Sequence, residues 1–351
     1  KVHRSGPDGW GGQGMMETAT HGHAPDTCRE PAWALGIDVG GTSAKIGFVN
    51  GAGESSRVVR VETGAAPADQ ILDAMIAAAR QLMAAPDAPG PLRGIGLSVC
   101  GFADLDRQIP TFINVRSLNG YPLGDRLSAA FGLPTVMEID SNAATLAEYY
   151  HGAGKGAERL LCVTLGTGLG VGMIIKGAIL RLTENCLGDA GQIVVNPLGE
   201  TCACGGRGCA EEEVSIRAVE RRARRVARSA RASCLNQKPP AGATWRPSEV
   251  AERAEGGDMV AREIWQEVGW WLGRAVASWA AIFGPDRVVI TGGLSRAGDL
   301  LLEPARKSLK HHGEPYFVDK LQLVPGLFPD EAALIGCTLP FFRRVPEWRV
   351  G

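Results

Sequence analysis

Neither an excess of charge of one sign nor a long uninterrupted apolar run is present in this chain of 351 residues. Its 37 lysines and arginines nearly balance 38 aspartates and glutamates, so no net field draws it toward nucleic acid or an anionic membrane. No stretch approaches the roughly 18 to 20 apolar residues that a membrane-spanning helix needs. We therefore expect a cytoplasmic protein that acts on small molecules, without nucleic acid or membrane partners.

A distributed disulfide framework is also missing, although nine cysteines are present. The only tight cluster is Cys202, Cys204 and Cys209, and its spacing is typical of a metal site. We expect reduced thiols and one candidate zinc site.

A sustained period is absent from residues 1–32, which are rich in Gly, His, Asp, Thr and Pro. We expect a disordered N-terminal extension in this segment. The sequence begins with Lys, and Met15 or Met16 is a candidate natural start.

From residue 33 onward, apolar runs alternate with helical patterns, as an α/β fold requires. Residues 34–49 have the pattern of a strand, a glycine turn and a second strand, and residues 160–175 repeat this design. Two similar hairpins suggest two related halves. We expect a small N-terminal α/β domain over 33–150 and a larger C-terminal α/β domain over 151–325.

The first glycine turn follows an acid at the end of a strand. Its candidate ligand-binding residues are Asp38, Gly40, Gly41, Thr42 and Lys45. Glycines leave room for a phosphate, whose oxygens the backbone N–H groups and the Thr42 hydroxyl can bind, and Asp38 is suited to hold Mg²⁺ through water. A glycine hairpin without a ligand is the alternative interpretation.

The second turn contains Gly166, Thr167, Gly168 and Gly170. It is neither a Walker A loop nor a dinucleotide site, because no Lys-Ser/Thr pair lies near and no helix follows. A third segment, a buried strand, ends in Gly292 and Gly293, which would let an adenine or ribose lie close to the backbone. A simple strand-to-helix turn is the alternative for this third segment.

These elements, taken in order, resemble the ROK family (repressors, open reading frames, kinases) within the actin/hexokinase/Hsp70 ATPase superfamily. The resemblance extends from about Ala34 to Phe342. The segments that carry it are Gly36-Ile-Asp-Val-Gly-Gly-Thr, Cys100-Gly101 before Asp104, Asp140-Ser-Asn-Ala-Ala, Gly166-Thr-Gly-Leu-Gly-Val-Gly, Cys202-Ala-Cys-Gly-Gly-Arg-Gly-Cys209-Ala-Glu211 and Val289-Ile-Thr-Gly-Gly.

The resemblance implies a two-lobed actin-like ATPase fold, ribonuclease H-like in topology, with the active site in the cleft between the domains. It implies an ATP- and Mg²⁺-dependent kinase that phosphorylates a hydroxyl, which we expect to be primary, of a sugar or sugar-like polyol. Asp140 matches the carboxylate that accepts the proton of the attacking hydroxyl. A helix N-cap is a compatible structural role for Asp140. Residues 326–345 resemble the family's closing helix, which packs back on the small domain, and a homodimer is implied.

The residues that match the family's sugar-contacting positions are Gly101, Asn114, Asp189 and Glu211. Beside them the chain departs from the family pattern: Ile139 replaces an Asn, and Asp189 and Gln192 replace a Glu and a His. Because Ile139 cannot pair with a ring hydroxyl, we expect a modified hexose or a C7 cyclitol of the valiolone type as acceptor. Glucose or an amino or N-acetyl hexose is the alternative.

The cysteine cluster resembles the family's structural zinc loop, whose fourth ligand is the His that Gln192 replaces. Zinc prefers four sulfur and nitrogen ligands in a tetrahedron. Candidates for the fourth ligand are Cys186, the Gln192 oxygen and water, and a loop with free thiols is the alternative.

Two further alternatives are non-catalytic. Repressors of this family carry a DNA-binding helix-turn-helix of roughly 60 or more residues ahead of the kinase-like body. Only about 33 residues without a helical period precede the first strand here, which favours a kinase. An inert sugar sensor has no chemical need for Asp38 and Asp140, which this chain retains.

Overall fold

The computed structural model describes residues 32–111, 115–229, 232–236 and 244–349. Its first sheet has the strand order β3-β2-β1-β4-β7. The strands are β1 (Trp33–Val39), β2 (Ser43–Asn50), β3 (Ser55–Glu62), β4 (Leu92–Val99) and β7 (Thr135–Ile139). β1, β2 and β3 form two successive antiparallel hairpins, whereas β4 and β7 run parallel to β1.

The second sheet has the order β12-β11-β8-β9-β10-β13. Its strands are β8 (Arg159–Leu165), β9 (Leu169–Ile175), β10 (Ala178–Arg181), β11 (Arg287–Thr291), β12 (Gln322–Pro325) and β13 (Glu347–Arg349). β8, β9 and β10 form antiparallel hairpins, and β11 and β12 run parallel to β8. The second sheet therefore repeats the strand order and directions of the first, with β13 added at one edge.

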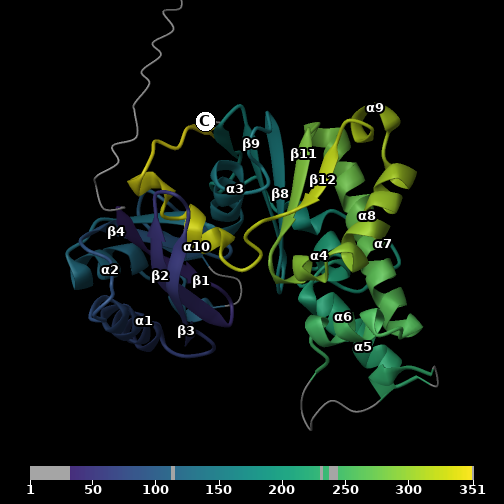
Figure 1. The fold of residues 1–351 in the computed structure, drawn as a ribbon, viewed down its shortest axis with the longest axis horizontal. Coiled ribbons are helices and arrows are strands. Elements are labelled where there is room, and N and C mark those ends of the chain that lie inside the picture. Colours follow the sequence, from purple (N-terminus) through teal and green to yellow (C-terminus); the bar gives the residue numbers. More distant parts are fainter. Residues whose placement is uncertain (1–31, 112–114, 230–231, 237–243, 350–351) are drawn as a thin grey trace, which may run out of the picture. The chain divides into compact units, whose positions relative to one another are not determined.

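Helices cover the outer faces of both sheets. α1 (Ala68–Met83) and α2 (Leu123–Phe131) pack on the first sheet in one core with its strands. On the second sheet, the long α7 (Met259–Phe283) and α8 (Asp299–His312) pack against one another, as Figure 1 shows on its right side. Shorter helices complete this part: α4 (Ala210–Glu213), α5 (Ile216–Ala227), α6 (Pro247–Glu255) and α9 (Pro315–Val318).

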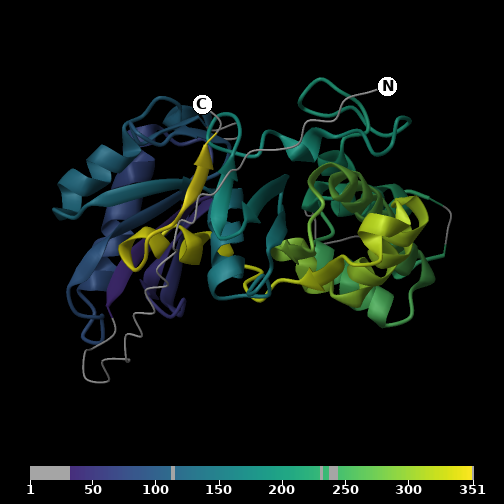
Figure 2. The same ribbon diagram turned by 90° about the horizontal axis from the view of Figure 1, so that it is seen from above.

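One buried helix, α3 (Asp140–Tyr150), lies between the two sheets and contacts β8 and β9 as well as β7 (Figure 2). After β12 the chain crosses back to the first sheet and forms α10 (Ala332–Gly336), which packs on α3 and on β1, β2 and β4. The α3–α10 contact is so close that a Cβ on Gly336 would lie 1.7 Å from the Ala143 carbonyl oxygen. Glycine is therefore required where these two helices meet.

Several local expectations are confirmed, one is wrong, and the predicted closing helix is shorter than expected. Both glycine hairpins are present, and so are the predicted strand 135–139 and the helix that follows it. The N-cap of α3 is Ile139, however, so the N-cap interpretation of Asp140 is wrong: Asp140 is the first residue inside the helix. The closing segment contains one five-residue helix, α10, and a short 3₁₀ turn (Leu339–Phe341).

The predicted N-terminal extension lies outside the described residues, apart from Ala32, and the domain boundaries stay predictions. Among the described helices, none is both long and apolar enough to cross a membrane.

Candidate active site

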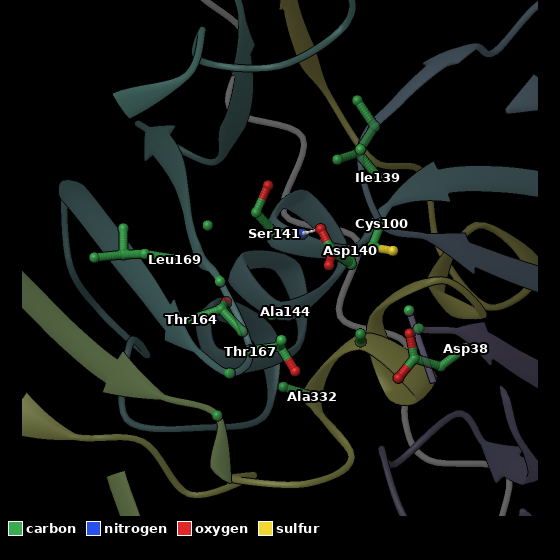
Figure 3. A pocket seen from close by; sticks show the side chains of 18 of the residues that line it. Asp38, Cys100, Ile139, Asp140, Ser141, Ala144, Thr164, Thr167, Leu169 and Ala332 are labelled. Carbon is green, nitrogen blue, oxygen red and sulfur yellow. Dashed lines mark hydrogen bonds between the residues drawn. The ribbon is translucent and has the colours of Figure 1, made fainter. Parts of the chain in front are cut away.

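A cavity of about 620 Å³ opens where the two sheets face one another. β1, β4 and β7 are parallel, so their carboxyl ends meet at one edge of the first sheet, as do those of β8 and β11 in the second. This arrangement brings together Asp38 from β1, Cys100 and Gly101 after β4, and Asp140 after β7. Figure 3 shows Cys100 beside Asp140 and Asp38 close to them.

Asp38 is held from two sides. Ser98 Oγ on β4 donates a hydrogen bond to Asp38 Oδ1 at 2.9 Å, and Lys45 Nζ lies 3.3 Å from Asp38 Oδ2. Lys45 also donates to the carbonyl oxygen of Asp330 at 2.6 Å, so it ties the first hairpin to the crossover segment before α10. The Asp38 carboxylate lines the cavity, and its oxygens fit the preference of Mg²⁺ for hard oxygen ligands.

Asp140 is half-buried at the start of α3, where its Oδ1 accepts a hydrogen bond from the Ser141 N–H at 2.6 Å. Burial, together with the negative charge of Asp38, raises the pKa of Asp140 to about 7, although the Ser141 hydrogen bond and the Lys45 charge oppose the shift. A carboxyl group with a pKa near neutrality is suited to accept and release a proton.

The same surroundings act on the thiol of Cys100. Burial and the charges of Asp140 and Asp38 raise the pKa of Cys100 well above its usual range. Cys100 is therefore a neutral thiol at the base of the cleft.

All the glycine-turn residues singled out from the sequence line the cavity: Gly40, Gly41, Thr42, Gly166, Thr167, Gly168, Gly170, Gly292 and Gly293. Some of these glycines also have packing reasons. A Cβ on Gly170 would lie 2.9 Å from Ser141 Cβ, and one on Gly168 would lie 2.5 Å from Glu211 Oε2. Gly292 has φ of +87°, and a Cβ there would meet the Leu165 backbone at 2.4 Å. The glycine pattern thus reflects close packing as well as open space.

The expected acceptor residues Gly101, Ile139, Asp189, Gln192 and Glu211 line the same cavity. Glu211 accepts hydrogen bonds from the Leu169 N–H at 3.0 Å and from Arg217 at 3.2 Å. Partial burial and the charge of Glu211 raise the pKa of Asp189, while a hydrogen bond from Gln192 opposes this shift. Asn114, the remaining acceptor residue, lies outside the described residues.

The cysteine cluster lies next to this acceptor side. The sulfur atoms of Cys202, Cys204 and Cys209 lie within 4.8 Å of one another, and the Gln192 Oε1 atom lies 3.0 Å from Cys202 Sγ. Three thiols and an amide oxygen fit the ligand number of a structural zinc ion. Cys186, the other candidate ligand, is not among the described residues whose ligand atoms cluster within 4.8 Å of one another, and its thiol contacts the carbonyl oxygens of Thr183 and Gly188.

The sequence of this chain matches the profile of the ROK family over residues 34–341. It belongs to the ROK family.

Relatives include both enzymes and regulators. A glucokinase of Halalkalibacterium halodurans is 32% identical over 308 residues, which cover 87% of this chain and 93% of the relative. A ROK family glucokinase of Streptomyces griseus, solved with glucose and AMPPNP, is 32% identical with a TM-score of 0.77, and the match covers 87% of this chain and 98% of that one. The transcriptional repressor Mlc of Escherichia coli is 27% identical over 252 residues, covering 71% of this chain and 60% of the repressor.

The likeness to the Streptomyces griseus structure confirms the expected actin-like ATPase fold for this ROK protein. Sequence reasoning missed other lining residues, among them Phe102, Ser141, Thr164, Asp330 and Ala332. Of these, Asp330 lies 285 residues from Lys45, its hydrogen-bond partner. The only signal for it was the resemblance of the closing segment to the family.

Proposed function

We propose that this ROK protein is an ATP-dependent kinase that phosphorylates a hydroxyl, preferably a primary one, of a sugar or sugar-like polyol. The observation that carries the proposal is the joint placement of Asp38 and Asp140 at the ends of two parallel strands, facing the 166–170 glycine hairpin across one cavity. Phosphoryl transfer depends mainly on alignment, charge neutralisation and one proton acceptor, and this cleft offers groups for each. The glucokinase relatives support the same activity.

In the proposed reaction, Asp140 accepts the proton of the acceptor hydroxyl as the hydroxyl oxygen attacks the γ-phosphorus of ATP. The bond between the γ-phosphorus and the β–γ bridging oxygen breaks, and ADP leaves with that oxygen. The backbone N–H groups of the 40–42 and 166–168 turns bind phosphate oxygens, and Thr42 and Thr167 are assigned to the same task. Lys45 keeps Asp38 oriented and adds positive charge near the phosphates. Asp38 is the residue that would hold Mg²⁺, and the ion would supply neutralisation of phosphate charge when bound. Gly293, where a Cβ would meet nothing within 4 Å, leaves room for the nucleoside, and Gly292 is assigned to the same wall.

We propose a modified hexose or a C7 cyclitol of the valiolone type as the acceptor. Ile139 is 2% exposed and presents an apolar wall immediately before Asp140. A polar site rejects an analogue that lacks its hydrogen-bonding hydroxyl, so an apolar wall favours a ring without a hydroxyl at that position. Gly101, Asn114, Asp189, Gln192 and Glu211 are assigned to the remaining acceptor contacts. The second candidate acceptor is glucose or an amino or N-acetyl hexose, which the glucokinase relatives favour.

A panel of acceptors tests the proposal. ADP release from ATP is measured with glucose, N-acetyl hexoses and a C7 cyclitol, using the wild-type chain and Asp140→Asn. We expect turnover with at least one acceptor and a loss of about 10³-fold or more in kcat for Asp140→Asn with ATP binding retained. An Asp140→Asn variant as active as wild type removes Asp140 from its role, and turnover of glucose far above that of any cyclitol overturns the acceptor assignment.

A non-catalytic sugar sensor or repressor-like protein is the remaining alternative, and the similarity to the transcriptional repressor Mlc favours its repressor-like form. It predicts sugar binding without ADP release for every acceptor in the panel. A homodimer and a cytoplasmic location stay predictions for this protein.

A structural zinc ion is proposed for Cys202, Cys204 and Cys209, with the Gln192 side-chain oxygen as the fourth ligand. Metal analysis of protein purified without added zinc tests the assignment. We expect about one zinc per chain, retained less firmly in Gln192→Ala. A metal-free chain that unfolds at the same temperature with and without added zinc contradicts it.

A further inference from the structure

A buried ion pair lies directly behind the Ile139–Asp140 segment. Glu138, the residue before Ile139, is 7% exposed, and its carboxylate accepts hydrogen bonds from the Ile139 N–H at 2.9 Å and from Asn142 Nδ2 at 3.1 Å. Arg181, 4% exposed at the end of β10, donates two bonds to the same carboxylate at 2.9 and 2.5 Å. The Glu138 carboxylate thus holds residues on both sides of Asp140.

Arg181 extends this network in two further directions. Its Nη1 donates to the Asn185 carbonyl oxygen at 3.0 Å, in the loop that leads to Asp189 of the cleft. Its Nη2 lies 3.1 Å from Glu347 Oε1, and Glu347 is the first residue of β13. One guanidinium therefore connects the start of α3, the loop on the acceptor side and the C-terminal strand.

β13 is an addition to the repeated part of the fold. It lies beyond residues 34–341, the part that matches the family profile, and pairs in parallel with β10. Val345 and Glu347 line a second cavity of about 180 Å³, together with Glu138 and Arg181. This terminal segment therefore forms part of the wall around the buried pair.

We propose that Glu138 and Arg181, closed by Glu347 of β13, form a positioning unit that holds Asp140 at the geometry needed for proton transfer. The proposal rests on the proposed role of Asp140 as the base. Arg181 is suited to the task because its planar fork binds a carboxylate in two places at once. A buried pair that loses one partner leaves an uncompensated charge, so the backbone around it shifts. A displacement of about 1 Å at a reacting group can lower the rate about 10²-fold.

The chain contains a matched arrangement away from Asp140. Arg222 pairs with the buried Glu213 and lies 2.9 Å from Glu267 Oε1 on α7. Each buried arginine therefore has a second, more exposed carboxylate beside it: Glu267 beside Arg222 and Glu347 beside Arg181. If Glu347 contributes only to stability, removing its charge should affect kcat no more than removing the charge of Glu267 does.

The experiment compares Glu347→Gln with Glu267→Gln in the full-length chain, alongside Arg181→Lys, which keeps the charge but loses the fork. Thermal midpoints, kcat and the KM for ATP are measured for each. We expect kcat to fall about 3- to 10-fold in Glu347→Gln and about 10²-fold in Arg181→Lys, with the KM for ATP unchanged. Glu267→Gln is expected to keep kcat within about twofold of wild type, even if its thermal midpoint falls as much as that of Glu347→Gln.

Amide hydrogen exchange of residues 138–143 is a second readout that needs no turnover. We expect faster exchange in Glu347→Gln and no change in Glu267→Gln. If kcat and exchange in Glu347→Gln and Arg181→Lys match those of Glu267→Gln, the positioning role is wrong. If the wild type turns over no acceptor, the proposed kinase function fails, while the exchange comparison still decides whether the unit holds this segment.

Discussion

Asp140 stands beside a second carboxylate, Asp38, in a cleft that removes part of its hydration. Both effects favour the protonated form of Asp140. The same environment that brings its pKa near neutrality therefore destabilises the folded chain once Asp140 is ionised. The Lys45 charge already offsets part of this effect, and bound Mg²⁺ would relieve more of it, so the energetic cost is largest in the ligand-free protein.

The difference in stability between the Asp140→Asn variant and the wild type is expected to change with pH in a defined direction. The pKa of Asp140 is raised from 3.8 to about 7 on folding, so its contribution to stability is fully present below about pH 4 and is lost as pH rises through 7. Asparagine cannot ionise and escapes this loss. Without Mg²⁺ or nucleotide, we expect Asp140→Asn to gain on the order of 1–2 kcal/mol relative to wild type between pH 5 and pH 8, measured by thermal unfolding.

The exposed Asp319→Asn variant provides the control for this measurement, since its carboxylate lies on the surface near α9. Only the part of the pH-dependent difference that exceeds the one seen in Asp319→Asn is attributed to the surroundings of Asp140. A difference between Asp140→Asn and wild type that stays constant from pH 5 to pH 8 would contradict the assigned environment.

Ile139 is expected to set acceptor preference rather than catalysis. Replacing it by Asn, the residue that the family pattern has before the catalytic Asp, adds a donor and an acceptor to the wall of the site. We expect Ile139→Asn to raise kcat/KM for glucose relative to a C7 cyclitol by about 10-fold or more, because a paired ring hydroxyl is worth about 1–3 kcal/mol. Ile139→Val, which keeps the wall apolar, is the control. Equal shifts of the ratio in both variants would exclude a polar-pairing role.

At the scale of elements, α3 is the part that joins the halves of the site. It begins with Asp140, packs between the two sheets and contacts α10. Near its C-terminal end, Glu148 is fully buried and accepts hydrogen bonds from the N–H groups of Ala153 at 2.9 Å, Leu327 at 3.1 Å and Phe328 at 3.0 Å. This carboxylate therefore fastens the crossover segment to the helix that carries Asp140.

Glu148→Ala is expected to lower stability by about 3–5 kcal/mol, because three N–H groups lose their partner in a buried region. Glu148→Gln keeps the size of the side chain and one acceptor oxygen, so we expect it to lose about half as much. Chemical denaturation of both variants is the measurement. Equal stability of Glu148→Ala and wild type would mean that water replaces the carboxylate and that the crossover is held elsewhere.

How far the sequence predicts these elements depends on whether the signal is local. The two hairpins, the strand before Asp140 and the packed helix after it have local patterns of period and glycine, and the structure confirms them. The Glu138–Arg181 pair was not foreseen, because it joins residues 43 positions apart whose proximity follows only from the fold, which brings the end of β10 next to β7. Gln192 was a candidate zinc ligand from its place in the family pattern, but only the fold brings its oxygen to Cys202 and leaves Cys186 outside the cluster of ligand atoms.

At the scale of the whole described chain, the cleft is lined by two sheets that have the same strand order, with α3 and α10 between them. Phosphate ligands are expected from the first hairpin on one side and the second hairpin on the other, and the acceptor contacts span both sides. A phosphoryl group in transfer must be kept from water. Binding of both substrates should therefore draw the two sheets together around the cavity.

We expect this closure to appear as cooperative protection from amide hydrogen exchange. In Asp140→Asn, which should hold ATP, Mg²⁺ and acceptor without turnover, residues 40–43 and 166–170 should both exchange more slowly with the two substrates together than with either alone. Helix α1, on the outer face of the first sheet, provides an internal control whose exchange should not change. If the nucleotide alone protects both hairpins fully and the acceptor adds nothing, the cleft closes on nucleotide by itself. Coupling between the two substrates would then be absent, and water exclusion could not be the step that commits the acceptor to reaction.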